Sequence, residues 1–353
     1  MLKVGILGAG KMGKVYARWF SANPHCEVVA FYNRTRERAE ELSRRYGGTV
    51  FDTWEALVSD AVVDAVGICT PSHQHLAQIE RALEMGKHVL CEKPLAKDIH
   101  ECRRILELSR AARSKMMVGF QMRFHPVVTT VDRLLERVGK VYHAEFVFGL
   151  YRPGVTWRHR LIEGGGVLKE LSSHLFDLLE HWVGELSAVT GLNRIIEPDR
   201  EVEDYSVNVL EFRNGASGFL FSSYLERRSS CILGNLMGTE GQISLQFSPY
   251  DPSDSRVVLF ANNVTDIPIA IPSEIDEVYP GHLDSFKREI DHFVECILHD
   301  EQPMISAAEG LRALEIIDAS YESTRQGGRK ISLPLGAFSQ SDLERCFQRF
   351  ARG

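Results

Sequence analysis

The sequence predicts two domains: an α/β domain built on a doubly wound parallel sheet, followed by an α+β domain rich in antiparallel strands. Three observations predict this organisation. The chain has 353 residues, more than one ordinary hydrophobic core contains. Buried strands alternate with helical patterns through the first third, which is typical of parallel βαβ units. After Arg137, the period-2 patterning of antiparallel strands takes over.

Composition and charge exclude several classes of protein. The net charge of −7, from 41 basic and 48 acidic residues, lacks the excess of basic residues that is typical of nucleic-acid-binding proteins. Apolar runs such as Ala61–Val63 are soon broken by Asp64, so no stretch approaches a membrane span of roughly 20 residues. The first residues enter a strand without the features of a secretory signal, and seven scattered cysteines contain no CxxC pair. We therefore expect a cytoplasmic protein with reduced thiols, no structural disulfides and no metal site.

A glycine-rich turn follows the first predicted strand, Lys3–Leu7, and precedes a helical pattern. This strand–turn–helix context is the one that a dinucleotide fingerprint requires, although a plain glycine-rich turn is the alternative. Gly8 permits the tight turn, Gly10 lets the backbone approach a pyrophosphate, and Gly13 allows close packing of helix and strand. Because helix N-termini favour anions, we expect the pyrophosphate there, beside Lys11 and Met12.

The second predicted strand, Glu27–Tyr32, ends at a residue that bears on cofactor choice. An acidic residue at this point would bind the ribose 2′-hydroxyl of NAD, but Asn33 stands there instead. Arg34, Arg36 and Arg38 follow, and guanidinium groups bind phosphate in a bidentate way. The sequence therefore favours NADP(H), with NAD(H) possible. The alternative is that these arginines form the solvated first turns of the next helix.

Two further strand ends carry polar residues. Thr70 and Pro71 follow the predicted strand Val62–Cys69, and Glu92 and Lys93 end the short strand that begins at His88. In open α/β sheets, ligands bind at the carboxyl ends of the strands, so we expect these residues beside the glycine turn. A lysine there can donate or accept a proton. The alternative is a surface Glu-Lys pair before a turn.

The second part of the chain reads as strands and helices in a different pattern. Asn214-Gly215 is a strong hairpin signal that joins two of the predicted strands. The predicted strands are Val141–Gly149, Tyr205–Phe212, Ser217–Tyr224, Cys231–Leu236 and Gln242–Gln246. Helices are predicted at Leu283–Leu298, Ala307–Thr324 and, loosely attached, Ser339–Gly353.

Three glycines, Gly164–Gly166, lead into a predicted helix over Val167–Trp182. Within it Glu170, His174 and Asp177 fall at i, i+4 and i+7, so their side chains should project from one face. A carboxylate and an imidazole one turn apart are a plausible proton-handling set. The alternative is that His174 is a core histidine that Asp177 holds; in either case we expect Asp177 to be structural.

Four motifs carry a resemblance to a known family: GAGKMG, CTPSHQH, GKHVLCEKP and a GGG followed by a histidine. Together they resemble the Gfo/Idh/MocA family, which includes glucose–fructose oxidoreductase, inositol dehydrogenases and many sugar dehydrogenases. The resemblance covers nearly the whole chain, and GKHVLCEKP is its most specific part. It implies a Rossmann domain, here residues 1–121, and a domain with a large open, mostly antiparallel sheet, here residues 122–353.

The resemblance also implies roles for individual residues. Lys93 would contact both the nicotinamide and the substrate hydroxyl, and Arg123 would lie near the substrate. The residues expected near the cofactor are Thr70, Pro71, His75, Glu92 and Gln121. Glu170 departs from the aspartate that the family usually has at this position, which puts its role in doubt. Trp157 and Arg158 precede the glycines and are expected to line the mouth of the site, where arginines could bind an acidic or phosphorylated sugar; we expect His159 and Arg160 in a solvated loop.

These observations predict an NAD(P)-dependent oxidoreductase that acts on a secondary alcohol, or the matching ketone, of a sugar, cyclitol or derivative. His174 would be the general base in oxidation, Lys93 would stabilise the alkoxide, and Glu170 would orient the substrate or Lys93. The opposite assignment, with Lys93 as the proton relay, stays open. Two other classes stay open as well: a non-catalytic nucleotide-binding regulator, and a glycosidase that retains its cofactor for transient oxidation. We expect a homodimer or homotetramer assembled through the open sheet.

Overall fold

The computed structural model describes residues 1–152, 154–156, 159–161, 165–227, 230–248, 251–261, 263–267, 280–336 and 340–350. The chain forms two compact units. The first contains Met1–Gln121 and Ser285–Leu311, and the second contains Met122–Asp284 and Arg312–Gly353. The sequence placed the whole of 122–353 in the second domain, whereas Ser285–Leu311 packs with the first unit.

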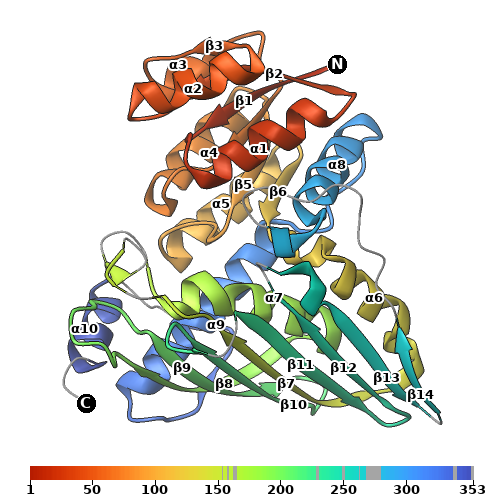
Figure 1. Cartoon of the computed structure of the whole chain (residues 1–353). Helices are drawn as coiled ribbons and strands as arrows, with labels where there is room; N and C mark the ends of the chain where they lie inside the picture. The colour runs from red at the N-terminus through yellow and green to blue at the C-terminus, as the bar shows by residue number, and fades with distance from the viewer. Residues whose placement is uncertain are drawn as a thin grey trace. The chain divides into compact units, whose positions relative to one another are not determined.

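The first unit is built on a six-stranded parallel sheet in the order β3-β2-β1-β4-β5-β6 (Figure 1). This order is that of a Rossmann fold, and it reverses direction between β1 and β4. The predicted doubly wound parallel sheet is therefore confirmed. The strands are β1 (Leu2–Leu7), β2 (Cys26–Tyr32), β3 (Thr49–Val50), β4 (Ala65–Ile68), β5 (His88–Glu92) and β6 (Met116–Gly119).

Side-chain caps define where two helices of this unit begin. Thr53 accepts a hydrogen bond from the backbone N–H of Ala56 at 3.1 Å, and Asp98 accepts one from Glu101 at 2.9 Å. These caps start α3 and α5. The helices are α1 (Lys11–Ala22), α2 (Arg36–Tyr46), α3 (Trp54–Ser59), α4 (His75–Glu84), α5 (Ile99–Ala111) and α8 (Ser285–Leu298), with the short 3₁₀ helix η1 (Ser72–Gln74) before α4.

Helix α8 comes from late in the chain but completes the first unit by packing on α1. The rings of Phe20 and Phe293 lie 6.4 Å apart, and the Asn23 amide donates a hydrogen bond of 2.7 Å to Asp291. After α8, the backbone N–H of Val118 in β6 donates to the carbonyl of Ile305 at 3.2 Å. The edge strand of the parallel sheet thus contacts chain that follows β14 of the second unit in sequence.

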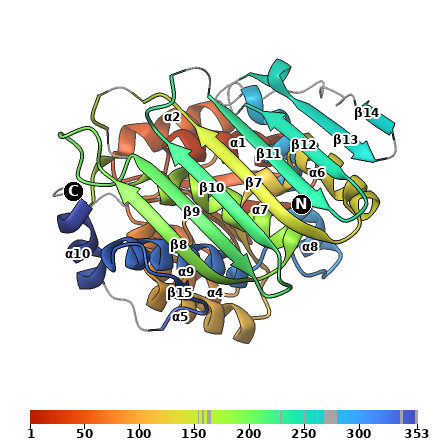
Figure 2. The ribbon, with the colours of Figure 1, turned by 90° about the horizontal axis from the view of Figure 1, so that it is seen from below.

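The second unit contains a nine-stranded sheet in the order β14-β13-β12-β11-β7-β10-β9-β8-β15 (Figure 2). The pairs are antiparallel except β7 with β10, which confirms a mostly antiparallel sheet. Gly215 has a φ of +87° in the predicted β9–β10 hairpin. The strands are β7 (Val141–Gly149), β8 (Leu186–Arg194), β9 (Tyr205–Phe212), β10 (Ser217–Ser223), β11 (Cys231–Gly238), β12 (Gln242–Phe247), β13 (Arg256–Ala261), β14 (Asn263–Ile267) and β15 (Ile331–Ser332).

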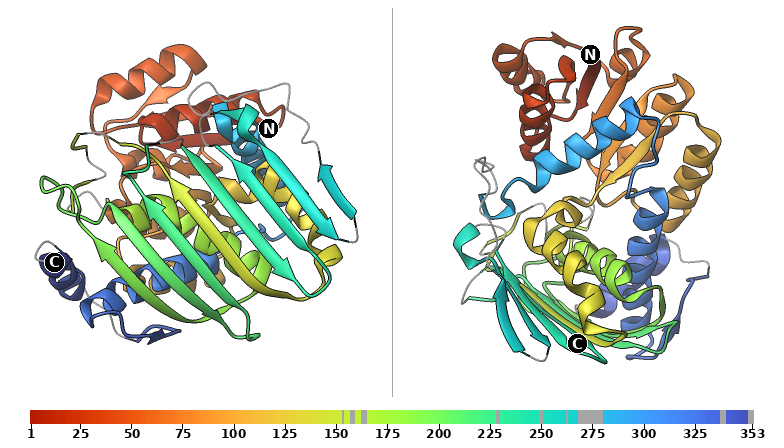
Figure 3. Two further views of the ribbon diagram at one scale, coloured as in Figure 1. Left: turned by 60° about the horizontal axis from the view of Figure 1, so that its bottom comes forward. Right: turned by 90° about the vertical axis from the view of Figure 1, so that its right-hand side faces the viewer.

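Helices cover one face of this sheet and leave the other open, as Figures 2 and 3 show. The covered face holds buried apolar side chains such as Leu210, Leu220 and Ile232. The helices of the unit include α6 (Pro126–Leu134), α7 (Ser173–Val183), α9 (Ala307–Arg325), which begins in the first unit, and α10 (Gln340–Phe350). None of the helices within the described residues is long and apolar enough to cross a membrane.

Candidate active site

The glycine turn after β1 has the geometry that a bound pyrophosphate needs. Gly8 has a φ of +96°, and a Cβ there would lie 2.7 Å from the carbonyl oxygen of Cys69, at the end of β4. A Cβ on Gly13 would lie 1.9 Å from the Gly8 oxygen, whereas one on Gly10 would meet nothing within 4 Å. The turn is therefore closed on the protein side and open at Gly10, where α1 presents its N-terminus.

The end of β2 is tied to this turn by Asn33. Its Oδ1 accepts a hydrogen bond from the Ala9 N–H at 2.9 Å, and its Nδ2 donates to the Thr35 carbonyl at 2.8 Å. The three arginines that follow differ in their surroundings. Arg36 pairs with Glu40 at 3.0 Å and also with Asp52. Arg34 and Arg38 are exposed, and within the described residues neither of them makes an ion pair.

The His75 ring bridges the turns that follow β4 and β5. Its ring is buried, with Nε2 2.8 Å from the Thr70 carbonyl oxygen and Nδ1 3.1 Å from that of Leu95. Burial lowers the pKa of this imidazole, so it carries one N–H, and the Cys91 thiol 3.3 Å from Nδ1 can supply the second hydrogen. His75, predicted to lie near the cofactor, thus positions the two turns that carry Thr70 and Lys93.

The motif Glu92-Lys93-Pro94 ends β5 at the same sheet edge. Lys93 is partly exposed, while the Glu92 side chain is buried and accepts a hydrogen bond from the Lys93 N–H at 3.2 Å. Burial, and then the charge of Glu92, raise the pKa of the Tyr16 hydroxyl and of the Glu289 carboxyl. Glu92 therefore lies in a buried acidic group within the first unit, in which burial and the charge of Glu92 favour the protonated form of Glu289.

The other predicted cofactor residues of this unit differ in burial. Lys11 and Pro71 are exposed, and Met12 and Thr70 are half-buried, whereas Gln121 is buried. The hydroxyl of Thr70 donates to Gln78 at 2.6 Å. The structure therefore brings the glycine turn, Thr70 and Lys93 to one edge of the parallel sheet.

In the second unit, Glu170 and His174 lie on the predicted helix, but its first turns are wider than expected. Leu168–Ser172 is a π-helix in which the N–H of Ser173 donates to the Leu168 carbonyl, and α7 continues to Val183. Glu170 is partly exposed and His174 is buried. The prediction that Glu170 and His174 project from one face assumed a regular α-helix. The π-turn changes the angle between these two side chains around the helix axis.

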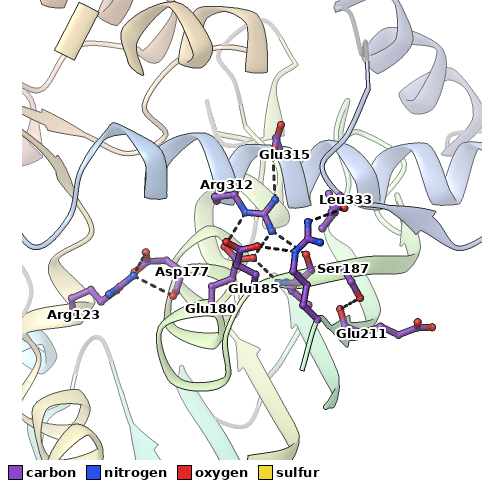
Figure 4. Close-up of polar contacts among 11 residues, drawn as sticks. Arg123, Asp177, Glu180, Glu185, Ser187, Glu211, Arg312, Glu315 and Leu333 are labelled. Carbon is purple, nitrogen blue, oxygen red and sulfur yellow. Dashed lines mark hydrogen bonds and ion pairs between the residues drawn. The ribbon is translucent and has the colours of Figure 1, made fainter. Parts of the chain in front are cut away.

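Arg123 and Asp177 form a bidentate ion pair (Figure 4). The Nε of Arg123 donates to Asp177 Oδ2 at 2.6 Å and its Nη2 donates to Oδ1 at 2.8 Å, with both side chains buried. This bidentate pair was not predicted from the sequence. The expected positions of Arg123 near the substrate and of Asp177 beside His174 stay predictions.

The loop before the helix departs from expectation at one residue. His159 is fully buried rather than solvated, with its Nδ1 accepting from the Thr156 N–H at 3.0 Å, whereas Arg160 is exposed and pairs with Glu201. The predicted site residues Trp157 and Arg158 lie outside the described residues.

Two buried glutamates, Glu203 and Glu289, were missed by sequence reasoning. Glu289 lies on the same face of α8 as the apolar residues Phe286, Ile290 and Phe293. A charged residue on an apolar helical stripe was the signal that could have identified it. Glu203 precedes β9 and gave no comparable periodic signal.

Comparison with known proteins decides the family. The sequence model of the Gfo/Idh/MocA oxidoreductase family with an NAD-binding Rossmann fold matches residues 2–120, and the model of its C-terminal α/β domain matches residues 133–333. The chain belongs to this oxidoreductase family. The resemblance drawn from the motifs is therefore confirmed.

Relatives of this Gfo/Idh/MocA protein extend over almost its whole length. It is 27% identical to the inositol 2-dehydrogenase of Rhizobium meliloti over 94% of this chain and 99% of the relative. It is 26% identical to the scyllo-inositol 2-dehydrogenase (NAD(+)) of Bacillus subtilis over 92% and 95%. The structure of levoglucosan dehydrogenase with NADH and levoglucosan has the same fold, with a TM-score of 0.85 and 24% identity over 95% of this chain and 100% of that one.

Proposed function

We propose that the protein is an NAD(P)-dependent dehydrogenase or reductase acting on a secondary alcohol or ketone of a sugar, cyclitol or derivative. The observation that carries the proposal is the position of Lys93, at the carboxyl end of β5, on the same sheet edge as a glycine turn that is open at Gly10. Inositol 2-dehydrogenase is among the relatives over almost the full length, which supports this substrate class.

The residues of the first unit fit a dinucleotide. The turn from Gly8 to Gly13 and the N-terminus of α1 would bind the pyrophosphate, with Thr70, Pro71 and Lys93 further along the same edge. When bound, the cofactor supplies the nicotinamide carbon that accepts or donates hydride. The protein's task is then to orient the substrate carbon and to manage the proton of its hydroxyl.

Proton handling falls to Lys93 and His174. In oxidation, His174 removes the proton of the substrate hydroxyl, and the Lys93 ammonium group donates a hydrogen bond that stabilises the developing alkoxide. In reduction the same proton returns to the substrate oxygen. Glu170, which is partly exposed, orients the substrate. In the reverse assignment, Lys93 transfers the proton. The pH dependence of activity in single variants of Lys93 and of His174 distinguishes the two assignments.

Cofactor preference is proposed to be NADP(H) because no carboxylate stands at the end of β2. The Asn33 side chain accepts a hydrogen bond from Ala9 in the glycine turn. The exposed Arg34 is available for a 2′-phosphate. Arg36 is less suited because Glu40 and Asp52 already pair with it. Arg34 is therefore the residue on which the preference should depend.

Fluorescence titration with NADPH and NADH tests this preference. Arg34→Ala should weaken NADPH binding about tenfold or more, because a charged hydrogen bond contributes roughly 1.5–3 kcal/mol, and should leave NADH binding unchanged. Arg44→Ala removes an exposed arginine from the last turn of α2, the helix that begins two residues after Arg34, and should change neither affinity. Equal affinities of the native protein for the two cofactors would contradict the preference, and binding of neither would contradict the proposed function.

We also propose that copies of the chain assemble through the open face of the nine-stranded sheet. One row across this face is apolar in five neighbouring strands: Leu233, Val147, Phe221, Val207 and Leu192 are successive cross-strand partners. Leu233 and Leu192 are each 40% exposed. A continuous apolar row on an uncovered sheet is typical of a contact surface, and a homodimer or homotetramer would cover it.

A further inference from the structure

Glu203 is a fully buried carboxylate at the start of the helix that carries Glu170 and His174. Its Oε1 accepts hydrogen bonds from the backbone N–H of Leu168 at 2.9 Å and from the Tyr321 hydroxyl at 3.0 Å. Its backbone carbonyl accepts a further hydrogen bond from the N–H of Val167 at 3.1 Å. Two consecutive N–H groups at the beginning of the helix are therefore bound by one residue that lies 35 positions from Leu168.

The last glycine of the GGG motif makes this contact possible. Gly166 has a φ of +118°, and a Cβ there would lie 2.6 Å from Oε1 of Glu203. Any larger residue would push the carboxylate away from Leu168 and strain the backbone. The Tyr224 hydroxyl also donates to the Gly166 carbonyl at 3.3 Å, so the turn is held from a second side. Gly166 thus allows Glu203 to approach the start of the helix.

The contact has a consequence for the site because the helix begins with a π-turn. N-terminal N–H groups need an acceptor, and Val167, which precedes the π-turn, has no side chain that can cap it. Glu203 supplies that acceptor from another segment. A wide i→i+5 turn can relax toward the α-helical pattern. Fixing its first N–H groups therefore also fixes the directions in which the following side chains project from the helix.

We propose that Glu203 is a positioning residue for the reaction, which caps the π-turn at Leu168 and thereby holds Glu170 and His174 in place. This inference rests on the proposed function only for its kinetic consequence. The capping itself concerns the second unit alone and can be measured without any substrate.

The acceptor oxygen, rather than the negative charge, should be what matters. Burial raises the pKa of the Glu203 carboxyl to about 7, although the bonds from Leu168 and Tyr321 and the nearby charge of Lys169 oppose the shift. A protonated carboxyl still accepts hydrogen bonds through its carbonyl oxygen. A glutamine at position 203 should therefore still accept these hydrogen bonds and preserve the cap.

Three substitutions at Glu203 test the proposal together with a matched control. Glu203→Gln keeps the acceptor, Glu203→Asp withdraws it by one methylene, and Glu203→Ala removes it. The control is Asp204→Ala. Asp204 is also fully buried, accepts backbone N–H groups from Ile196 at 2.9 Å and Glu197 at 3.0 Å, and pairs with the buried Arg200 at 3.2 Å. Its removal therefore also destabilises this unit, but it caps a different turn. Each variant is examined as folded protein by amide hydrogen exchange and by steady-state kinetics.

In hydrogen exchange, Glu203→Ala and Glu203→Asp should expose the amides of Leu168–Ser172, whereas Glu203→Gln and Asp204→Ala should not. In kinetics, Glu203→Ala should lower kcat on the order of 100-fold without changing the KM for the nucleotide, since a misplacement of about 1 Å can have this effect. Glu203→Gln should stay within about threefold of the native enzyme, an energy difference of about 0.7 kcal/mol.

Two results would overturn the proposal. One is unchanged exchange of the Leu168–Ser172 amides in both Glu203→Asp and Glu203→Ala. The other is a loss of kcat in Asp204→Ala equal to that in Glu203→Ala, because a general loss of stability would then explain both. If the native protein turns over no sugar or cyclitol, the proposed function fails, and the exchange experiment still decides whether Glu203 caps the π-turn.

Discussion

At the scale of single residues, the glycines of the N-terminal turn have separable roles. A Cβ at Gly13 would collide with the Gly8 carbonyl oxygen at 1.9 Å, whereas a Cβ at Gly10 would meet nothing within 4 Å. Gly13 is therefore required by the fold itself. Gly10 is required only if something else comes close to the turn, and a pyrophosphate is the group that the open N-terminus of α1 would bind.

We predict that Gly10→Ala folds as the native protein does and binds nucleotide more weakly, because the added methyl group occupies the side of the turn that the ligand approaches. Gly13→Ala should lower the midpoint of urea unfolding, since helix and strand must separate to admit the methyl group. Urea denaturation and nucleotide titration of both variants check this. Unchanged nucleotide affinity in Gly10→Ala would contradict the placement of the pyrophosphate.

Glu289 gives a prediction for the pH dependence of stability. Neither of its carboxylate oxygens has a hydrogen-bond partner among the described residues, and burial beside Glu92 raises its pKa well above 4.5. Above pH 4.5 the unfolded chain has released this proton while the folded protein keeps it. The folded protein therefore loses stability through this group as pH rises.

Glu289→Gln removes the titration while keeping the shape of a neutral carboxyl. The free energy of unfolding of this variant, relative to the native protein, should rise between about pH 5 and about pH 8. Chemical denaturation across this range measures it. The control Glu27→Gln changes a surface glutamate of the same unit, whose side chain is 49% exposed, and should give a nearly constant difference. A constant difference for Glu289→Gln as well would show that Glu289 titrates normally.

At the scale of elements, the Arg123–Asp177 pair joins the start of the second unit to α7. We predict that Arg123→Ala destabilises the protein by about 3–5 kcal/mol, because a buried carboxylate then loses its compensating charge. Arg160→Ala breaks an exposed pair with Glu201 and should cost about 1 kcal/mol or less. Urea unfolding measures the free energy of unfolding of both variants. Similar losses of this free energy would show that burial does not make the Arg123–Asp177 pair more important for stability than the exposed pair.

Elements with strong local patterns could be predicted from the sequence, while others depend on distant partners. The bounds of β7 and β9 agree with the predicted strands because apolar and polar residues alternate along them. Strand β8 was not predicted. It contains Gly191 and the buried Asn193, which bond to Ser320, Ser323 and Thr324 of α9, so polar residues occupy positions that a periodic pattern assigns to the core.

The same distinction applies to the candidate site. Gly8–Gly13, Thr70 and Lys93 could be placed at one sheet edge because parallel strands share their carboxyl ends. The partner of Arg123, the capping of Leu168 by Glu203 and the electrostatic coupling of Glu289 to Glu92 could not be predicted. Each joins residues that only the tertiary fold brings together, and the π-turn before α7 has no periodic signature in the sequence.

At the scale of the whole molecule, the open sheet face predicts the oligomeric state. Phe221→Lys places a charge at the centre of the apolar row Leu233–Val147–Phe221–Val207–Leu192 and should convert the assembly into monomers. Leu298→Lys changes an exposed apolar residue of α8, 47% exposed, and should leave assembly unchanged. Sedimentation velocity distinguishes the two. If the native protein is monomeric, or if Phe221→Lys keeps the native mass, assembly through this face is contradicted.

The most direct test of the central claim is the rate of nicotinamide reduction by the purified protein. The assay offers NADP+ or NAD+ with a panel of sugars and cyclitols, and compares the native chain with Lys93→Met and His174→Gln. Lys97→Met, an exposed lysine four residues from Lys93 and paired with Glu101, is the control. We predict turnover of at least one substrate, a loss of about 10²–10⁴-fold in kcat for each of the two site variants, and native activity in the control. Near-native turnover in both Lys93→Met and His174→Gln, or tight nucleotide binding without turnover of any substrate, would contradict the account.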